Sequence, residues 1–164
     1  MSTTNLANRH MIYTEILAAL ISATLGMGAM FTKGLVWHAL SRNPDFMGIP
    51  YRFWVGAPMA VFGSALIFIC VIEWIHGRKW GDQELLVASR LREWFALLSC
   101  LSCFTLALDM VMHKSFWVAP VVTIHATILA STFAFCAYKS RRLCVVLDPR
   151  FSTERLRREL PNLW

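Results

Sequence analysis

Four apolar segments, separated by shorter polar ones, account for most of the hydrophobic and polar pattern of this chain. They cover residues 11–31, 53–75, 94–112 and 116–138. A helix advances about 1.5 Å per residue, so about 20 apolar residues cross a hydrocarbon layer of roughly 30 Å. Residues 54–72 and 116–138 contain no Asp, Glu, Lys or Arg. The pattern predicts an all-α integral membrane protein built as a four-helix bundle.

Two further segments complete the predicted architecture. Residues 82–93 combine leucines with alternating charges, which is typical of a short amphipathic helix at the membrane interface before the third span. Residues 139–164 form a basic, partly helical tail that ends on the apolar pair Leu163-Trp164. We therefore expect a transmembrane domain over residues 1–138 and, over residues 139–164, an element that docks onto a neighbouring subunit.

The distribution of charge predicts the topology. With four spans, both termini and the loop 76–93 share one side, which carries twelve basic residues, and the other side carries four. Basic residues gather on the cytoplasmic side of membrane proteins. We therefore expect both termini in the bacterial cytoplasm or the mitochondrial matrix. The twelve are Arg9, Arg78, Lys79, Arg90, Arg92, Lys139, Arg141, Arg142, Arg150, Arg155, Arg157 and Arg158; the four are Lys33, Arg42, Arg52 and Lys114.

The formal net charge of +6 follows from this topology and does not indicate nucleic-acid binding. Basic groups beside a membrane attract anionic phospholipid head groups. We expect this contact at Arg78, Lys79, Arg141 and Arg142.

A stripe of small residues marks the first span, with Ala18, Ser22 and Gly26 four residues apart. Such stripes let helix backbones approach closely in lipid, so we expect helix packing or partner contact there. Glu15 lies one turn inside the basic boundary, where it can reach the interface or pair with an arginine. Cys100 and Cys103 are one turn apart on a buried helix and are interpreted as packing residues instead of a redox pair.

Asp109, His113 and His125 are the candidate metal ligands. The first two share a helix face, being four residues apart. Pro120 suits the first turn of the fourth helix, which places His125 about 8 Å along it, at a depth similar to that of Asp109. A carboxylate with two imidazoles suits copper, zinc or iron. The alternative is a structural one, with His125 bonded to a carbonyl and Asp109 paired with Lys114.

Part of the chain resembles the C subunit of copper membrane monooxygenases, the particulate methane and ammonia monooxygenases. Trp37-His38, the element from Arg42 to Phe46, Phe53-Trp54 and Pro58 are similar to its first metal-site region. Asp109-x-x-x-His113, then Phe116-Trp117 and His125, are similar to its Asn-x-x-x-His element. The order agrees over residues 37–125.

The chain also departs from that family. Gly34 stands where the family has an acid, Pro50 or Tyr51 where it has a second histidine, and the gap between His113 and His125 is shorter. The resemblance therefore implies that the first metal site is lost and that the second keeps Asp109 in place of asparagine.

These observations favour a small multi-pass subunit of a larger energy-transducing or oxidoreductase complex, such as a respiratory chain, with other membrane subunits and phospholipid as partners. We expect a structural, non-catalytic role. The alternative is a copper-binding, C-like subunit of a membrane monooxygenase. A transporter or channel is not favoured, because Glu15, Glu73 and Asp109 lie near segment ends and no path of several buried charges is predicted.

Overall fold

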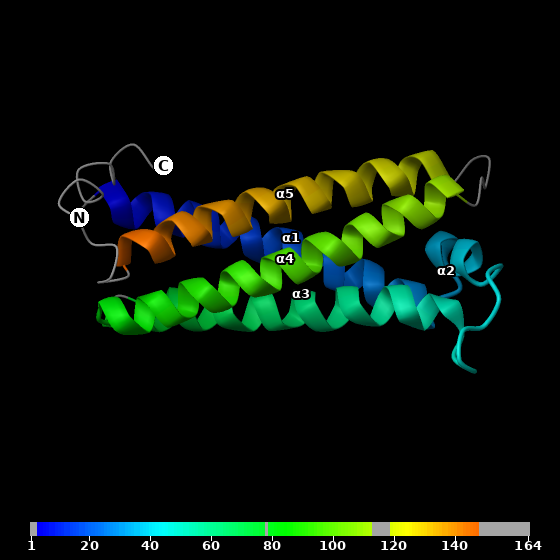
Figure 1. The fold of residues 1–164 in the computed structure, drawn as a ribbon, viewed down its shortest axis with the longest axis horizontal. Helices are drawn as coiled ribbons and strands as arrows, with labels where there is room; N and C mark the ends of the chain where they lie inside the picture. The colour runs from blue at the N-terminus through cyan, green and yellow to red at the C-terminus, as the bar shows by residue number, and fades with distance from the viewer. Residues whose placement is uncertain (1–2, 78, 113–118, 148–164) are drawn as a thin grey trace.

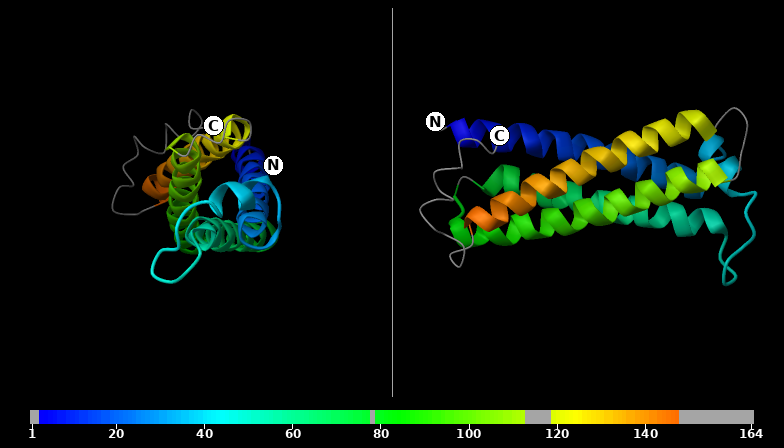
Figure 2. Two further views of the ribbon diagram at one scale, coloured as in Figure 1. Left: turned by 90° about the vertical axis from the view of Figure 1, so that its right-hand side faces the viewer. Right: turned by 45° about the horizontal axis from the view of Figure 1, so that its top comes forward.

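The computed structural model describes residues 3–77, 79–112 and 119–147. Within them the chain forms four long helices and one short one, and no strand. The helices are α1 (Thr3–Phe31), α2 (Leu35–Leu40), α3 (Tyr51–His76), α4 (Asp82–Met112) and α5 (Ala119–Leu147). The long helices lie side by side (Figure 1) around a common centre (Figure 2), with α1 packed mainly on α3 and α4 on α5.

Each long helix of the described chain is long and apolar enough to cross a membrane. The candidate spans are His10–Phe31, Tyr51–His76, Asp82–Met112 and Pro120–Val145. The predicted all-α, multi-pass membrane protein is thereby confirmed. The first turn of α1, the last turn of α5 and the connection between α3 and α4 all lie at one end of the bundle (Figure 1), here called the basic end.

Two finer predictions about this architecture are not confirmed. Residues 82–93, expected as a separate interfacial helix, are the first turns of the continuous helix α4. Helix α5 runs on to Leu147, beyond the expected domain boundary at residue 138. Residues 148–164, which include Leu163 and Trp164, lie outside the described residues, so their docking role stays a prediction.

Helix α4 turns small and polar side chains inward, together with Leu106 and Met110, and turns large apolar side chains such as Trp94 and Leu101 outward. Its inner face repeats every three or four residues and is at most 2% exposed. On its outer face Trp94 is 64% exposed and Leu101 61%. An inverted distribution of this kind needs an apolar surrounding, because in water the outer residues are the ones that burial would favour. The inner residues are Ser89, Arg92, Ala96, Ser99, Cys103, Leu106 and Met110.

The small-residue stripe of α1 packs inside the chain. A β-carbon on Gly26 would lie 2.5 Å from the carbonyl oxygen of Gly56, so the backbones of α1 and α3 meet there. Ala18 is buried, and the hydroxyl of Ser22 lies 3.6 Å from the sulfur of Cys103 on α4. The expected packing role is present, and helices of the same chain occupy the surface that we had also considered for a partner.

The loop of residues 41–50, which joins α2 to α3 and is here called the connection, lies at the opposite end of the bundle. Met47 and Gly48 both have positive φ, as the centre of a type I′ turn requires, and Phe46 pairs with Ile49 across them. The indole of Trp54 donates to the carbonyl of Phe46 at 3.1 Å. Leu40, at the end of α2, is fully buried, so this connection is fastened to the core.

The close approach of α1 and α3 gives a first prediction. Gly26→Ala should lower the free energy of unfolding by about 1–3 kcal/mol, since the added methyl meets backbone that cannot turn away. Gly28→Ala is the control on the same helix, because a β-carbon there lies 3.4 Å from a Thr32 side chain and nothing closer. Denaturant unfolding in bicelles measures both, and equal losses would contradict the close contact.

Candidate functional site

Three charged side chains meet inside the bundle near its basic end. Arg92 projects from α4, Glu15 from α1 and Glu73 from α3. Arg92 and Glu15 have no exposed surface, and Glu73 is 3% exposed. We call this group the charge cluster.

Arg92 holds both acids with short hydrogen bonds. Its Nε donates to Oε2 of Glu15 at 2.7 Å, and its Nη1 donates to the two carboxylate oxygens of Glu73 at 2.9 and 3.0 Å. The thiol of Cys70 adds a donor to Oε2 of Glu15 at 3.2 Å. One guanidinium therefore ties three transmembrane helices together at a single depth.

Charges at this depth are costly unless they are paired. Removing an ion from water costs several kcal/mol, and short, hydrogen-bonded ion pairs recover much of that cost. Once the cluster is formed, separating α4 from α1 or α3 would leave a bare charge in the membrane. The cluster therefore acts as a charged clamp between α1, α3 and α4.

Several buried side-chain polar atoms of the bundle have no hydrogen-bond partner. Among the described residues these include Oε1 of Glu15 and Nη2 of Arg92, both fully buried. Three buried hydroxyls share this property, those of Ser89, Ser99 and Ser140. Buried polar groups are normally satisfied, so these atoms distinguish the polar interior of the bundle from an ordinary packed core.

Sequence reasoning found one of the three members. Glu15 was expected to reach the interface or pair with an arginine, and it pairs with Arg92. Arg92 itself was counted among the interfacial cations, which is wrong because it is fully buried. The sequence predicts no path of several buried charges, and the three charges of the cluster gather at one place in the bundle. The inward repeat of α4, from Ser89 to Met110, is the signal that places Arg92 inside.

Asp109 lies near the C-terminal end of α4, where it contacts the connection between α2 and α3. The amide of Asn43 donates to its two carboxylate oxygens at 3.2 and 3.4 Å. The phenol of Tyr51 also interacts with this carboxylate. Asp109 is 7% exposed, so these contacts fasten the loop before α3 to the end of α4.

The predicted metal site is only partly within the described residues. His125 is exposed on α5, and its Nδ1 lies 2.7 Å from the carbonyl oxygen of Val121 on the same helix, as the structural alternative expected. His113 lies outside the described residues. Within the residues that the structure describes, no group of three His, Cys, Asp or Glu side chains is arranged to hold a metal ion. Copper or zinc binding by Asp109, His113 and His125 stays a prediction.

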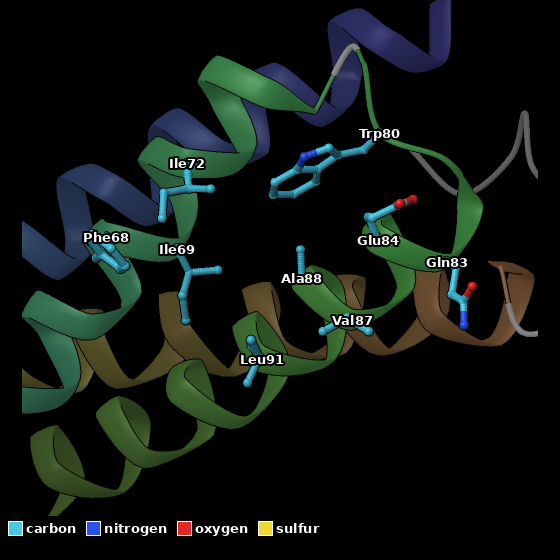
Figure 3. Close-up of a pocket in the computed structure, with 9 residues that line it drawn as sticks. All are labelled: Phe68, Ile69, Ile72, Trp80, Gln83, Glu84, Val87, Ala88 and Leu91. Atoms are coloured by element: carbon cyan, nitrogen blue, oxygen red, sulfur yellow. The ribbon is translucent and has the colours of Figure 1, made fainter.

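An apolar groove of about 540 Å³ lies between α3 and α4 at the basic end (Figure 3). Phe68, Ile69 and Ile72 form one wall, Val87, Ala88 and Leu91 the other, and Trp80 lies between them, with Gln83 and Glu84 at the rim. Its size and apolar walls suit a lipid chain. The carboxylate of Glu84 repels anionic head groups, so the groove does not explain the predicted contact with anionic phospholipid.

That predicted contact depends on cations elsewhere at the basic end. Lys79 is exposed, and the side chain of Arg141 is 75% exposed, with its Nε 4.0 Å from a carboxylate oxygen of Glu93. The guanidinium of Arg142 lies 5.5 Å from the ring centre of Tyr138. Arg78 lies outside the described residues. Lipid head-group binding by these four residues stays a prediction.

In comparisons with protein-family models, curated protein sequences and solved structures, the chain matches none of them. Its resemblance to the monooxygenase C subunit therefore depends on the quoted residues alone.

The charge cluster gives a second prediction. Arg92→Gln should lower the free energy of unfolding by about 3–5 kcal/mol, because two buried acids lose their counter-charge. Arg90→Gln is the matched control, an exposed arginine two residues away on the same helix. Denaturant unfolding in bicelles measures the difference.

A triple variant distinguishes the effect of leaving two acids without a counter-charge from the effect of replacing the arginine side chain. Combining Glu15→Gln, Glu73→Gln and Arg92→Gln removes every formal charge from the cluster and should recover much of the stability lost in Arg92→Gln alone. Equal stability of the Arg92→Gln and Arg90→Gln variants would show that the cluster does not hold the helices together.

Proposed function

We propose that this chain is a non-catalytic subunit of a larger membrane complex, with a structural and assembly role. One observation carries the proposal: the polarity of the bundle is inverted. Arg92 is satisfied by Glu15 and Glu73 inside the chain, whereas large apolar side chains such as Phe68, 67% exposed, cover the outside. Such outer faces suit lipid and the helices of other subunits.

We further propose that the parent complex is an energy-transducing or oxidoreductase assembly. The support is the distribution of basic residues, eleven against four once the buried Arg92 is left out, which favours the bacterial plasma membrane or the mitochondrial inner membrane. The paired state of Asp109 with Asn43 favours the structural role over metal chemistry at that residue.

The orientation is testable by labelling with a membrane-impermeant thiol reagent. Asn5→Cys and Leu160→Cys should be labelled from the cytoplasmic or matrix side, since the basic residues lie there. Met47→Cys, in the connection before α3 and 79% exposed, should be labelled only from the opposite side. Labelling of Asn5→Cys and Leu160→Cys from different sides would refute the proposed topology.

Assembly is testable on the chain as it exists in its membrane. After mild detergent extraction it should migrate on native gels with other proteins, because its apolar outer faces are covered. Removing Pro161–Trp164 should weaken that co-migration and leave membrane insertion, measured by resistance to alkaline carbonate, unchanged. Asn162→Ala is the control within the same four residues. A stable monomer with no co-migrating protein would contradict the structural-subunit proposal.

A further inference from the structure

The apolar groove between α3 and α4 runs from the membrane boundary into the apolar layer (Figure 3). Trp80 and Glu84 lie beside the point where α3 ends and α4 begins, at the basic end. Phe68 lies eight residues before the end of α3, and Leu91 lies nine residues after the start of α4. At about 1.5 Å per residue the groove reaches roughly 12–14 Å inward, close to half of a hydrocarbon layer of about 30 Å. An acyl chain of one lipid leaflet occupies the same depth.

The deep part of the groove is lined by apolar side chains on the outside of the bundle. Phe68, Val87 and Leu91 are exposed along it, and the small side chain of Ala88 leaves room beside Ile72. A flexible methylene chain gains dispersion contacts along such a surface and needs no polar partner there. The deep part of the groove therefore suits an acyl chain.

The shallow end of the groove is polar and carries both signs of charge. The carboxylate of Glu84 and the amide of Gln83 lie at the rim, and Lys79 is exposed in the link that leads into α4. Trp80 is half-buried at the level of the membrane boundary, where its indole N–H can donate to the ester carbonyls of a lipid. A head group that fits this end therefore combines a cationic part for Glu84 with a phosphate for Lys79.

Charge complementarity selects one kind of head group. An anionic head group, that of phosphatidylserine included, brings a net negative charge to Glu84 and is disfavoured. A choline head group has no N–H donor and is typically bound by several aromatic rings, whereas Trp80 is the one aromatic side chain among the described residues of this rim. An ethanolamine head group ends in a primary ammonium with three N–H donors, which can bond to the Glu84 carboxylate and to the amide oxygen of Gln83.

We propose that the groove binds one phospholipid with an ethanolamine head group. Its ammonium pairs with Glu84, its phosphate pairs with Lys79, and one acyl chain lies along the apolar walls. The lipid covers the outside of the seam between α3 and α4 at the depth where Arg92 meets Glu73 inside. Binding of this lipid requires the membrane placement of the helices and does not depend on the proposed subunit role.

Native mass spectrometry of the full chain tests the proposal. The chain is released from nanodiscs that contain ethanolamine, choline and glycerol phospholipids in equal amounts and with the same acyl chains. The wild type should keep one ethanolamine lipid roughly tenfold more often than either of the others, the factor expected of a charge-assisted hydrogen bond. Glu84→Gln should lose most of this preference, because the carboxylate is removed. Asp45→Asn removes an exposed acid at the opposite end of the bundle and should leave the preference unchanged.

A second pair of variants tests the position of the acyl chain. Ala88→Leu fills the groove and should lower the retention of the ethanolamine lipid several-fold. Val111→Leu, at an exposed position near the other end of α4, should not.

Four results would overturn the proposal. The first is that the wild type keeps the three lipids equally, as a non-specific lipid annulus would, or prefers the anionic one. The second is that it carries a second copy of the chain in place of lipid. The third is that Glu84→Gln keeps the full preference, and the fourth is that a folded Ala88→Leu variant retains as much lipid as the wild type. If Ala88→Leu does not fold, the comparison of Glu84→Gln with Asp45→Asn decides the question.

Discussion

The bundle depends on one electrostatic constraint: a buried arginine that has to keep two acids in contact. Arg92 reaches Glu15 on α1 and Glu73 on α3 from α4, so three of the four spans share one set of hydrogen bonds. Lipid offers no alternative partner for any of these groups. Apolar contacts between helices in a membrane gain little over contacts with lipid, and the charged contact therefore distinguishes the correct packing from other arrangements of the same helices.

The remaining packing is consistent with that constraint. Away from the cluster, toward the opposite end of the bundle, α1 and α3 approach closely through Gly26, Gly56 and Gly63, which brings their backbones within contact of each other. At the opposite end, Asn43 fastens the connection before α3 to Asp109. The bundle is thus secured by polar contacts at both ends and by small residues between them, while many of its large apolar side chains, such as Phe68 and Trp94, face outward.

The four spans could be predicted from the sequence because their length and apolar content are local properties. The charge cluster could not, because it depends on which residues of distant helices share a depth and a direction. Arg90, Arg92 and Glu93 follow one another closely, and an alternating charge pattern is typical of an interfacial helix. In the structure α4 continues through this segment, which turns Arg92 inward and leaves Arg90 exposed. The charge pattern does not indicate that residues 82–112 form one continuous helix, and this continuity is what places Arg92 inside the bundle.

The pairing of Glu15 with Arg92 also has a consequence for how the protein is made. The two residues are 77 positions apart, and one whole span, α3, lies between α1 and α4 in the chain. During synthesis the first span enters the membrane before its arginine partner exists in the bilayer. Until α4 arrives, the acid of α1 has to be neutral or shielded by the insertion machinery. A chain that stops before α4 therefore leaves Glu15 in lipid without its arginine partner, and this chemical difference separates unfinished chains from finished ones.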